Sequence, residues 1–329
     1  MQLFFGTLNA LSLRDHKQAP SNDAPGKLVL LCAGLAAEGL DMVALQETRL
    51  PPGVVSSGDF IVVSSGCDSN FNFGCSLCLR NVVRLGSSVR FELDHIRVLA
   101  ASPTYLCVAV TSPLLVADIV SFHAPHAQHT DEFIQSWWKT LDSVLRGVKR
   151  QHAHLFFLGD ANGRVSATEY GNIGTHGAST PDVPGLEFTK VLSNFDLWLP
   201  STFSAYTSGD TWTWQHSSGT RHRLDYIAIP SSMRCSSVSC RVDHDFDTLS
   251  AHIDHALVTL SLVCDPIAPK PLPERRVHQF DRGALCQEDV RSLISDQMRA
   301  VALPAWHVDP DTHYAMLVSF LIATLKNLF

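Results

Sequence analysis

The stretch of sequence that decides the fold is HLFFLGDANGR, which runs from His154 to Arg164. Its first residues form a short apolar run that predicts a buried β-strand, and this run ends at Asp160 and Asn162. A carboxylate at the end of a buried strand is destabilising unless another group pairs with it. The stretch therefore predicts a strand that carries polar side chains to one edge of a sheet, where they face a cleft.

The same arrangement recurs in five other places along the chain. Apolar strand-like runs adjoin polar side chains at Asn9, at Gln46 with Glu47, at His123, at Asp225 and at Asp254 with His255. Several carboxylates in such positions, with Asn and His between them, indicate a site for a hard divalent cation. Magnesium fits because it prefers oxygen ligands and keeps several waters, so one or two protein carboxylates can hold it.

Helical runs separate some of the predicted strands. Their periodicity predicts helices at residues 27–38, 130–149 and 186–194. Strands mixed with helices in this way predict a layered α/β domain with sheets inside and helices outside. The glycine-, serine- and threonine-rich stretch at 161–185 predicts a long functional loop.

Composition excludes several classes of protein. The chain has 329 residues, of which 45% are hydrophobic and 17% charged, so it is not disordered. Its net charge of -7 provides no basic field, so any binding of nucleic acid must come from a local site. The nine scattered cysteines indicate a reducing, intracellular compartment. No apolar run reaches the roughly 20 residues that span a bilayer, and we expect no membrane association.

The chain divides near residue 264. Residues 1–264 hold the predicted domain, residues 265–284 form a proline-rich linker, and residues 285–329 form a tail with helices predicted at 285–301 and 311–328. The charges of residues 266–329 cancel, so the whole net charge falls before them. The last helix continues to the final residue without a capping signal, which indicates a truncated chain.

Six pieces of the first domain, between residues 7 and 258, together resemble a known family. They occur in the order TLNALSL, ALQET, SFHAPH, LGDANGR, HRLDYI and IDHALV. This order resembles the endonuclease/exonuclease/phosphatase superfamily, which includes pancreatic-type deoxyribonuclease and abasic-site endonucleases. The resemblance implies a four-layer α/β sandwich, in which two packed, mostly antiparallel sheets are flanked by helices. It also implies a metal-dependent phosphodiesterase or endonuclease.

The resemblance assigns the phosphate chemistry to five residues: His123, Asp160, Asn162, Asp225 and His255. Asp160 would be the base that deprotonates the attacking water, and Asn162 would donate to the phosphate or the water. His255 would contact the scissile phosphate, while Asp225 fixes its tautomer. His123 would donate to a phosphate oxygen.

The resemblance places the metal beside Asn9, Glu47 and Asp254. Glu47 would be the direct ligand of Mg²⁺, with Mn²⁺ as the alternative ion, and Asp254 would be an outer acid. Leu11 stands where some members carry a further acidic ligand, which weakens the case for a second metal.

The motif GNIGTHG at 171–177, followed by TWTW and HRLDYI, resembles the endonuclease part of LINE-type (non-LTR) retrotransposon polyproteins. The tail resembles the segment between that endonuclease and the reverse transcriptase. This branch implies DNA nicking, a nuclear location, and a tail that joined a polymerase region or another protein. The chain contains no polymerase motif, so we expect a partial element.

Two arginines and two tryptophans are candidates for substrate contact. Arg221 and Arg223 precede Asp225 and could meet phosphates, while Trp212 and Trp214 either stack on nucleobases or pack in the core. Because the net charge is negative, other hypotheses about the activity stay open. They are a phosphohydrolase acting on RNA, a phospholipid or an inositol phosphate, and an inactive binding relic.

Overall fold

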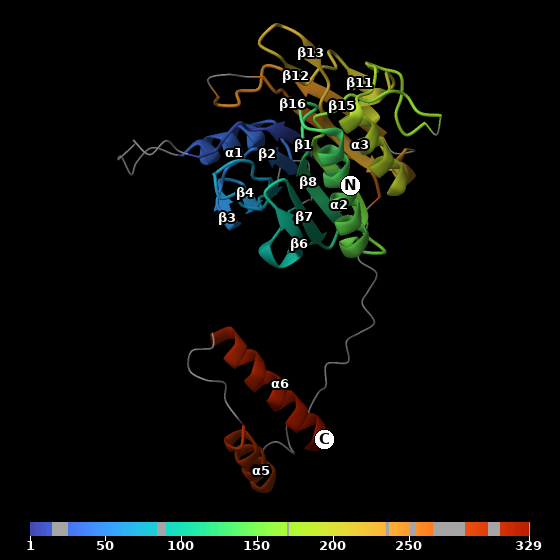
Figure 1. Cartoon of the computed structure of the whole chain (residues 1–329). Coiled ribbons are helices and arrows are strands. Elements are labelled where there is room, and N and C mark those ends of the chain that lie inside the picture. The colour runs from blue at the N-terminus through green and yellow to red at the C-terminus, as the bar shows by residue number, and fades with distance from the viewer. Residues whose placement is uncertain are drawn as a thin grey trace. The chain divides into compact units, whose positions relative to one another are not determined.

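The computed structural model describes residues 1–14, 26–83, 90–169, 171–234, 237–250, 254–265, 287–301 and 310–328. The chain forms two compact units, Met1–Pro269 and Lys270–Phe329, both drawn in Figure 1. The predicted linker at 265–284 falls almost wholly outside the described residues. In the described part of the chain, no helix has both the length and the apolar character needed to cross a bilayer.

Two sheets form the centre of the larger unit. The first has the order β11-β15-β16-β1-β2-β5-β4-β3 and the second β10-β14-β9-β8-β7-β6. Three neighbouring pairs, β1 with β2, β8 with β9 and β11 with β15, are parallel, and the rest are antiparallel. The strands of the first sheet are β1 (Gln2–Asn9), β2 (Met42–Gln46), β3 (Gly53–Ser57), β4 (Phe60–Ser64), β5 (Ser76–Arg80), β11 (Thr207–Ser208), β15 (Ser237–Asp243) and β16 (Leu257–Val263). Those of the second are β6 (Ile96–Ser102), β7 (Tyr105–Thr111), β8 (Val116–His123), β9 (His154–Asp160), β10 (Leu197–Trp198) and β14 (Asp225–Pro230).

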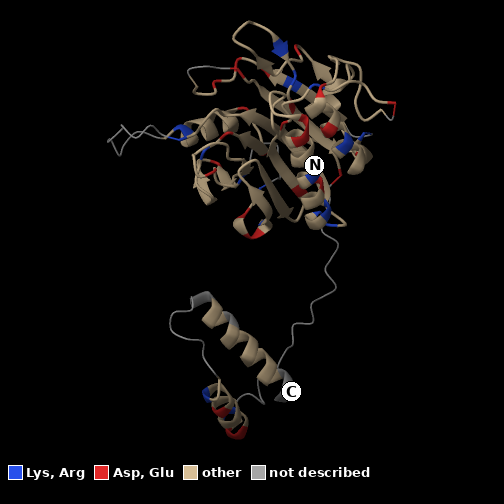
Figure 2. Ribbon diagram, in the orientation of Figure 1, with Lys and Arg blue, Asp and Glu red and all other residues tan. Residues whose placement is uncertain are grey.

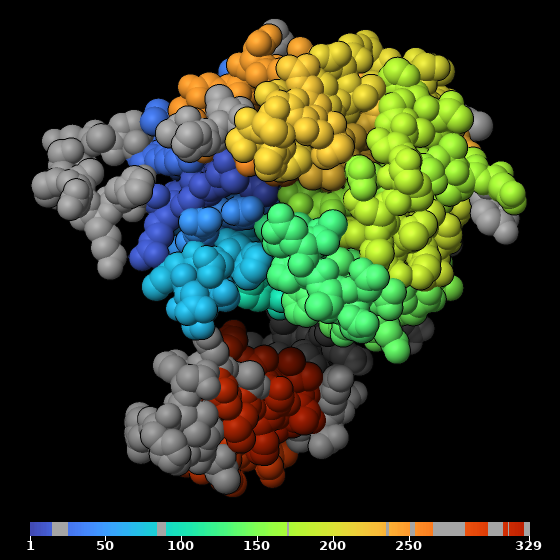
Figure 3. Space-filling model, turned by 45° about the horizontal axis from the view of Figure 1, so that its top comes forward, coloured from blue at the N-terminus to red at the C-terminus, as the bar shows by residue number. Residues whose placement is uncertain are grey.

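Helices cover the outer faces and complete four layers. The helices of the larger unit are α1 (Lys27–Ala37), α2 (Asp131–Val148) and α3 (Val183–Asn194), with short 3₁₀ turns η1 (Leu93–His95), η2 (Pro200–Thr202) and η3 (Ser231–Met233). One apolar cluster fills the space between the sheets, a second joins the six-stranded sheet to α2 and α3, and a third joins the eight-stranded sheet to α1. The predicted sandwich is therefore confirmed, and Figure 3 shows segments far apart in the sequence sharing one face of this unit.

The pairing register decides where the polar strand ends meet. Asn9 at the end of β1 lies beside Gln46 of β2. His123 at the end of β8 lies beside Asp160 at the end of β9, and Asp225 at the start of β14 lies on the other side of Asp160. Because β8 and β9 are parallel, their carboxyl ends reach the same edge of the sheet. The polar groups that ended separate runs of sequence therefore converge.

Parts of the stretch at 161–185 pack against their neighbours. Ile173 is buried, and the backbone N–H of Gly174 donates to Thr202 Oγ1 at 2.7 Å. A two-stranded hairpin, β12 (Trp214–Gln215) with β13 (Arg221–His222), follows this region and borders the same end of the sandwich as Asp225.

Most elements lie where the sequence predicts them, but the two-residue strands β10, β11 and β13 and the longer strands β3, β6 and β15 were not predicted. The core strands and helices α1, α2 and α3 lie within a few residues of their predicted positions. The strands β3, β6 and β15 were missed because they have at least one exposed face and weak apolar patterns. Among the described residues of the smaller unit, the helices are α5 (Glu288–Arg299) and α6 (Pro310–Leu328), close to the two predicted ones.

The close approach of β8 and β9 can be tested at Gly159. A Cβ there would overlap the carbonyl oxygen of Phe122 on β8, which cannot move without separating the strands. We expect Gly159→Ala to lower the free energy of unfolding by about 3 kcal/mol in a urea titration.

Gly147 on α2 provides the matched control. A Cβ at this position meets no atom, so Gly147→Ala should raise stability by up to about 1 kcal/mol through its better helix propensity. Equal unfolding midpoints for the two variants would contradict the close packing of the strands.

Candidate active site

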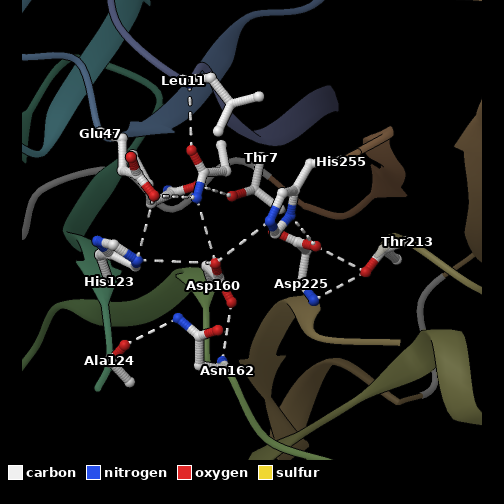
Figure 4. Close-up of polar contacts among 12 residues, drawn as sticks. Thr7, Leu11, Glu47, His123, Ala124, Asp160, Asn162, Thr213, Asp225 and His255 are labelled. Carbon is white, nitrogen blue, oxygen red and sulfur yellow. Dashed lines mark hydrogen bonds and ion pairs between the residues drawn. The ribbon is translucent and has the colours of Figure 1, made fainter. Parts of the chain in front are cut away.

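The converging strand ends line one cleft of about 680 Å³. All three predicted metal-side residues line it, as do four of the five predicted for phosphate chemistry: His123, Asp160, Asn162 and His255. The fifth, Asp225, is buried behind His255. Figure 4 shows Glu47, His123, Asp225 and His255 gathered around Asp160.

Asp160 is the centre of the arrangement and is almost completely buried. Its Oδ2 accepts a hydrogen bond from Asn9 Nδ2 at 3.3 Å, and its Oδ1 accepts from the backbone N–H of Asn162 at 2.8 Å. The Nε2 atoms of His123 and His255 each lie 3.8 Å from Oδ2. Burial and the nearby Asp225 carboxylate raise the pKa of Asp160 to about 7. A carboxylate with that pKa can take up and release a proton near neutrality.

A chain of hydrogen bonds fixes His255. Its Nδ1 lies 2.9 Å from Asp225 Oδ2, and the same oxygen accepts from Thr213 Oγ1 at 2.6 Å. Burial acts to lower the pKa of His255, but the carboxylates of Asp225 and Asp160 outweigh it and raise that pKa to about 10. The imidazole is therefore a cation that presents Nε2 to the cleft.

The role of Thr213 was not predicted. Its hydroxyl accepts from the backbone N–H groups of Leu224 and Asp225 at 2.9 and 3.0 Å while it donates to the Asp225 carboxylate. A threonine inside TWTW gives no signal of this kind in the sequence, because the contact depends on how the hairpin folds back on β14.

Glu47 lies on the opposite side of Asp160 from Asp225. Its backbone adopts a left-handed conformation with a φ of 52°, which turns its side chain out of the end of β2. Oε1 accepts from Asn9 Nδ2 at 3.1 Å and lies 3.7 Å from His123 Nε2. Burial acts to raise the pKa of Glu47, but His123, Asn9 and Arg49 outweigh it and hold that pKa below its usual range. Glu47 is therefore ionised at neutral pH.

The remaining predicted residues occupy different surroundings. Asn162 donates its side-chain N–H to the Ala124 carbonyl at 2.9 Å, so its contact with substrate stays a prediction. Asp254 lines the cleft, and its Oδ1 is buried without a hydrogen-bond partner among the described residues. Such an unpartnered buried oxygen is free to meet a cation.

Two groups of side chains could hold a metal. Ligand atoms of Asp160, Asp225 and His255 lie within 4.8 Å of one another. However, a protonated His255 has no lone pair for a metal, and its Nδ1 is already bonded to Asp225. Glu47 and Asp254, which line the same cleft, offer carboxylate oxygens, and these suit a hard cation such as Mg²⁺ better.

The two arginines predicted to contact phosphates do not line the cleft. Arg223 is buried and donates to the backbone carbonyls of Thr211 and His176, so its position does not support that role. Arg221 is exposed and packs its guanidinium over Trp212, 4.3 Å from the ring centroid. The arginines that do line the cleft are Arg49 and Arg164, which follow polar strand ends closely in the sequence.

The two cleft histidines should affect stability in opposite directions with pH. The raised pKa of His255 means that its pairing stabilises the fold fully below about pH 6.5, and this contribution is lost as pH rises toward about 10. Burial lowers the pKa of His123 to about 4, so its contribution is present above about pH 6.5 and is lost as pH falls toward 4. The free energy of unfolding is measured against pH in EDTA. His255→Gln should flatten the alkaline limb of this curve, and His123→Gln should flatten its acidic limb. Profiles that change on the same limb would contradict this electrostatic assignment.

Solved structures share the fold. AP endonuclease LMAP from Leishmania major aligns with a TM-score of 0.55 at 14% identity, covering 80% of this chain and 88% of that one. A 3′ phosphatase NExo from Neisseria, bound to a product DNA hairpin, aligns with a TM-score of 0.54 at 20% identity, covering 80% and 100%. The endonuclease domain of TRAS1, a telomere-specific non-LTR retrotransposon, aligns with a TM-score of 0.50 at 17% identity, covering 80% and 98%.

The family itself is shown by a sequence comparison. No curated protein matches the chain. The model of the Endonuclease/Exonuclease/phosphatase family matches residues 6–264, which is nearly all of the larger unit. The members of this family are metal-dependent nucleases and phosphatases. The chain therefore belongs to the endonuclease/exonuclease/phosphatase family and is a metal-dependent phosphodiester hydrolase.

Proposed function

We propose that the protein is a Mg²⁺-dependent DNA endonuclease that nicks DNA, of the type found in non-LTR retrotransposons. The observation that carries the proposal is the position of Asp160, a carboxylate with a pKa near neutrality between two imidazoles and a metal-side amide. Hydrolysis of a phosphodiester needs a base for the attacking water and positive charge on the phosphate oxygens. The cleft contains groups suited to both tasks.

In this proposal, Asp160 takes the proton of the attacking water. The hydrogen bonds from Asn9 and from the Asn162 backbone hold its two oxygens in place, so the carboxylate does not have to rotate. Protonated His255 donates from Nε2 to a non-bridging phosphate oxygen, and the Asp225–Thr213 pair holds its ring in that orientation. The hydrogen bond from His255 to the phosphate oxygen would strengthen as negative charge develops on that oxygen.

The metal-side residues Asn9, Glu47 and Asp254 line the same cleft as His255. Glu47, to which Asn9 donates from Nδ2, and Asp254 would hold Mg²⁺ or Mn²⁺, and the ion when bound would supply positive charge next to the phosphate and leaving oxygens. Neutral His123 lies close to both Glu47 and Asp160 and would donate to the phosphate. The contacts among these residues are intact, which favours a working site over an inactive relic.

DNA as the substrate is supported by two of the proteins that share the fold. The TRAS1 domain is an endonuclease of a non-LTR retrotransposon, and the NExo structure contains a DNA product. The motif at 171–177 and the tail add the resemblance to the retrotransposon branch. A tail that leads toward a polymerase region or another protein belongs to the same proposal.

The experiment is nicking of supercoiled plasmid by the purified chain, in Mg²⁺ and in EDTA. We expect nicking in Mg²⁺ only, with Asp160→Asn reducing the rate by at least about 100-fold because the base is lost. Asp94→Asn makes the same chemical change at an exposed position that does not line the cleft, and it should retain the full rate.

Two results would overturn the proposal. Nicking that persists in EDTA would remove the metal from the reaction, and unchanged nicking by Asp160→Asn would remove the base. Release of phosphate from a small phosphoester without any nicking would leave a phosphodiester or phosphoester hydrolase but move its substrate away from DNA.

A further inference from the structure

The cleft that surrounds Asp160 has few free positive charges. Figure 2 shows Lys and Arg interspersed with Asp and Glu over the larger unit. Among the described residues that line the cleft, the arginines are Arg49 and Arg164, and both are already paired. Arg49 Nη2 lies 3.4 Å from Glu47 Oε2, and Arg164 Nε lies 3.0 Å from Asp182 Oδ2. A duplex presents a phosphate charge about every 1.7 Å and is bound mainly by unpaired cations.

Aromatic and imidazole rings, rather than unpaired cations, line the walls of this cleft. Phe73 lines the cleft from the loop before β5 and is 39% exposed, although it is a large apolar side chain. His126, which follows β8, lines another wall and is exposed. Trp214 and His222 come from the β12–β13 hairpin and lie parallel, with 10° between their planes. Rings from three different loops therefore border the space where the phosphate would bind.

The backbone holds Phe73 in this position. Its carbonyl accepts from the backbone N–H of Arg49 at 2.9 Å, two residues after Glu47 in the sequence. Its φ of 63° lies in the left-handed region, which a phenylalanine seldom adopts. Phe71 in the same loop shares this conformation, with a φ of 61°, but its ring packs under the Arg14 guanidinium and does not line the cleft.

The availability of its ring faces separates Phe73 from Trp212 and from His126, whose ring centroid lies 4.3 Å from that of His129. One face of Trp212 meets His244, with ring centroids 3.9 Å apart, and the Arg221 guanidinium also packs over the ring. The contact of Phe73 with His123 is at 5.9 Å and tilted by 55°, so no ring is stacked flat on Phe73 in the described structure. Nucleobases stack on such faces whatever their sequence, but only when they are not paired within a duplex.

We propose that the cleft binds DNA whose nucleotides beside the scissile phosphate are unpaired, and that Phe73 and the Trp214–His222 pair bind these nucleotides by stacking. This inference rests on the proposed function, since it names the form of DNA that the same site takes. It follows that negatively supercoiled plasmid, which opens short unpaired segments, should be nicked faster than the relaxed closed circle of the same sequence.

The test measures binding, separately from cleavage. Asp160→Asn protein in Mg²⁺ is titrated into one labelled oligonucleotide, which is single-stranded, fully duplex, or duplex with a central unpaired bubble. We expect the single strand and the bubble to bind at least about tenfold more tightly than the duplex. Adding Phe73→Leu should weaken binding of the single strand about tenfold, because the stacking face is lost. Adding Phe71→Leu, in the same loop and with the same backbone strain, should leave it unchanged.

Two outcomes overturn the inference: equal or tighter binding of the duplex, or equal effects of the Phe73 and Phe71 substitutions. Failure of the proposed function gives a different result. A wild-type chain that nicks DNA but prefers duplex contradicts only the stacking inference. A wild-type chain that binds unpaired DNA selectively and cleaves nothing contradicts only the endonuclease proposal.

Discussion

The parallel pairing of β8 with β9 is the interaction on which the rest of the site depends. It brings His123 beside Asp160 at one edge of the six-stranded sheet, and the antiparallel pairing with β14 adds Asp225 on the other side. The eight-stranded sheet, packed face to face with the six-stranded sheet, contributes Asn9 at the end of β1 and Glu47 just after β2. Neither sheet holds the complete site, so the packing of the sandwich is also a condition of the chemistry.

Burial and neighbouring charges give these groups different protonation states. Asp225 and Asp160 hold His255 as a cation, while burial keeps His123 neutral. Glu47 is held ionised by the hydrogen bond from Asn9 and by the charge of Arg49, whereas Asp160, deeper and next to another carboxylate, has a pKa near neutrality. Two carboxylates in one cleft can therefore take different roles, one as an oxygen ligand and one as a base.

Much of this arrangement was predictable because the chemistry sits at strand ends. Asp160, Glu47 and His255 adjoin apolar runs in the sequence. A charged side chain at the end of a buried strand is destabilising unless another group pairs with it, so these positions indicate a site. The positions of other residues could not be predicted from the sequence, for a different reason. Thr213 and Phe73 reach their positions through a hairpin and a left-handed turn, neither of which has a periodic signature. Arg223 precedes Asp225 as expected, but burial against the carbonyls of Thr211 and His176 directs it away from the cleft.

The central claim is that Glu47 holds the metal while Asp160 acts on the water. Calorimetric titration of Mg²⁺ into wild type, Glu47→Gln and Asp160→Asn tests it most directly, because it reports the ion without any turnover. The account predicts that Glu47→Gln weakens Mg²⁺ binding at least about tenfold and that Asp160→Asn retains it. If Asp160→Asn loses the ion and Glu47→Gln keeps it, the metal belongs with Asp160, Asp225 and His255, and the roles given to the two carboxylates are wrong.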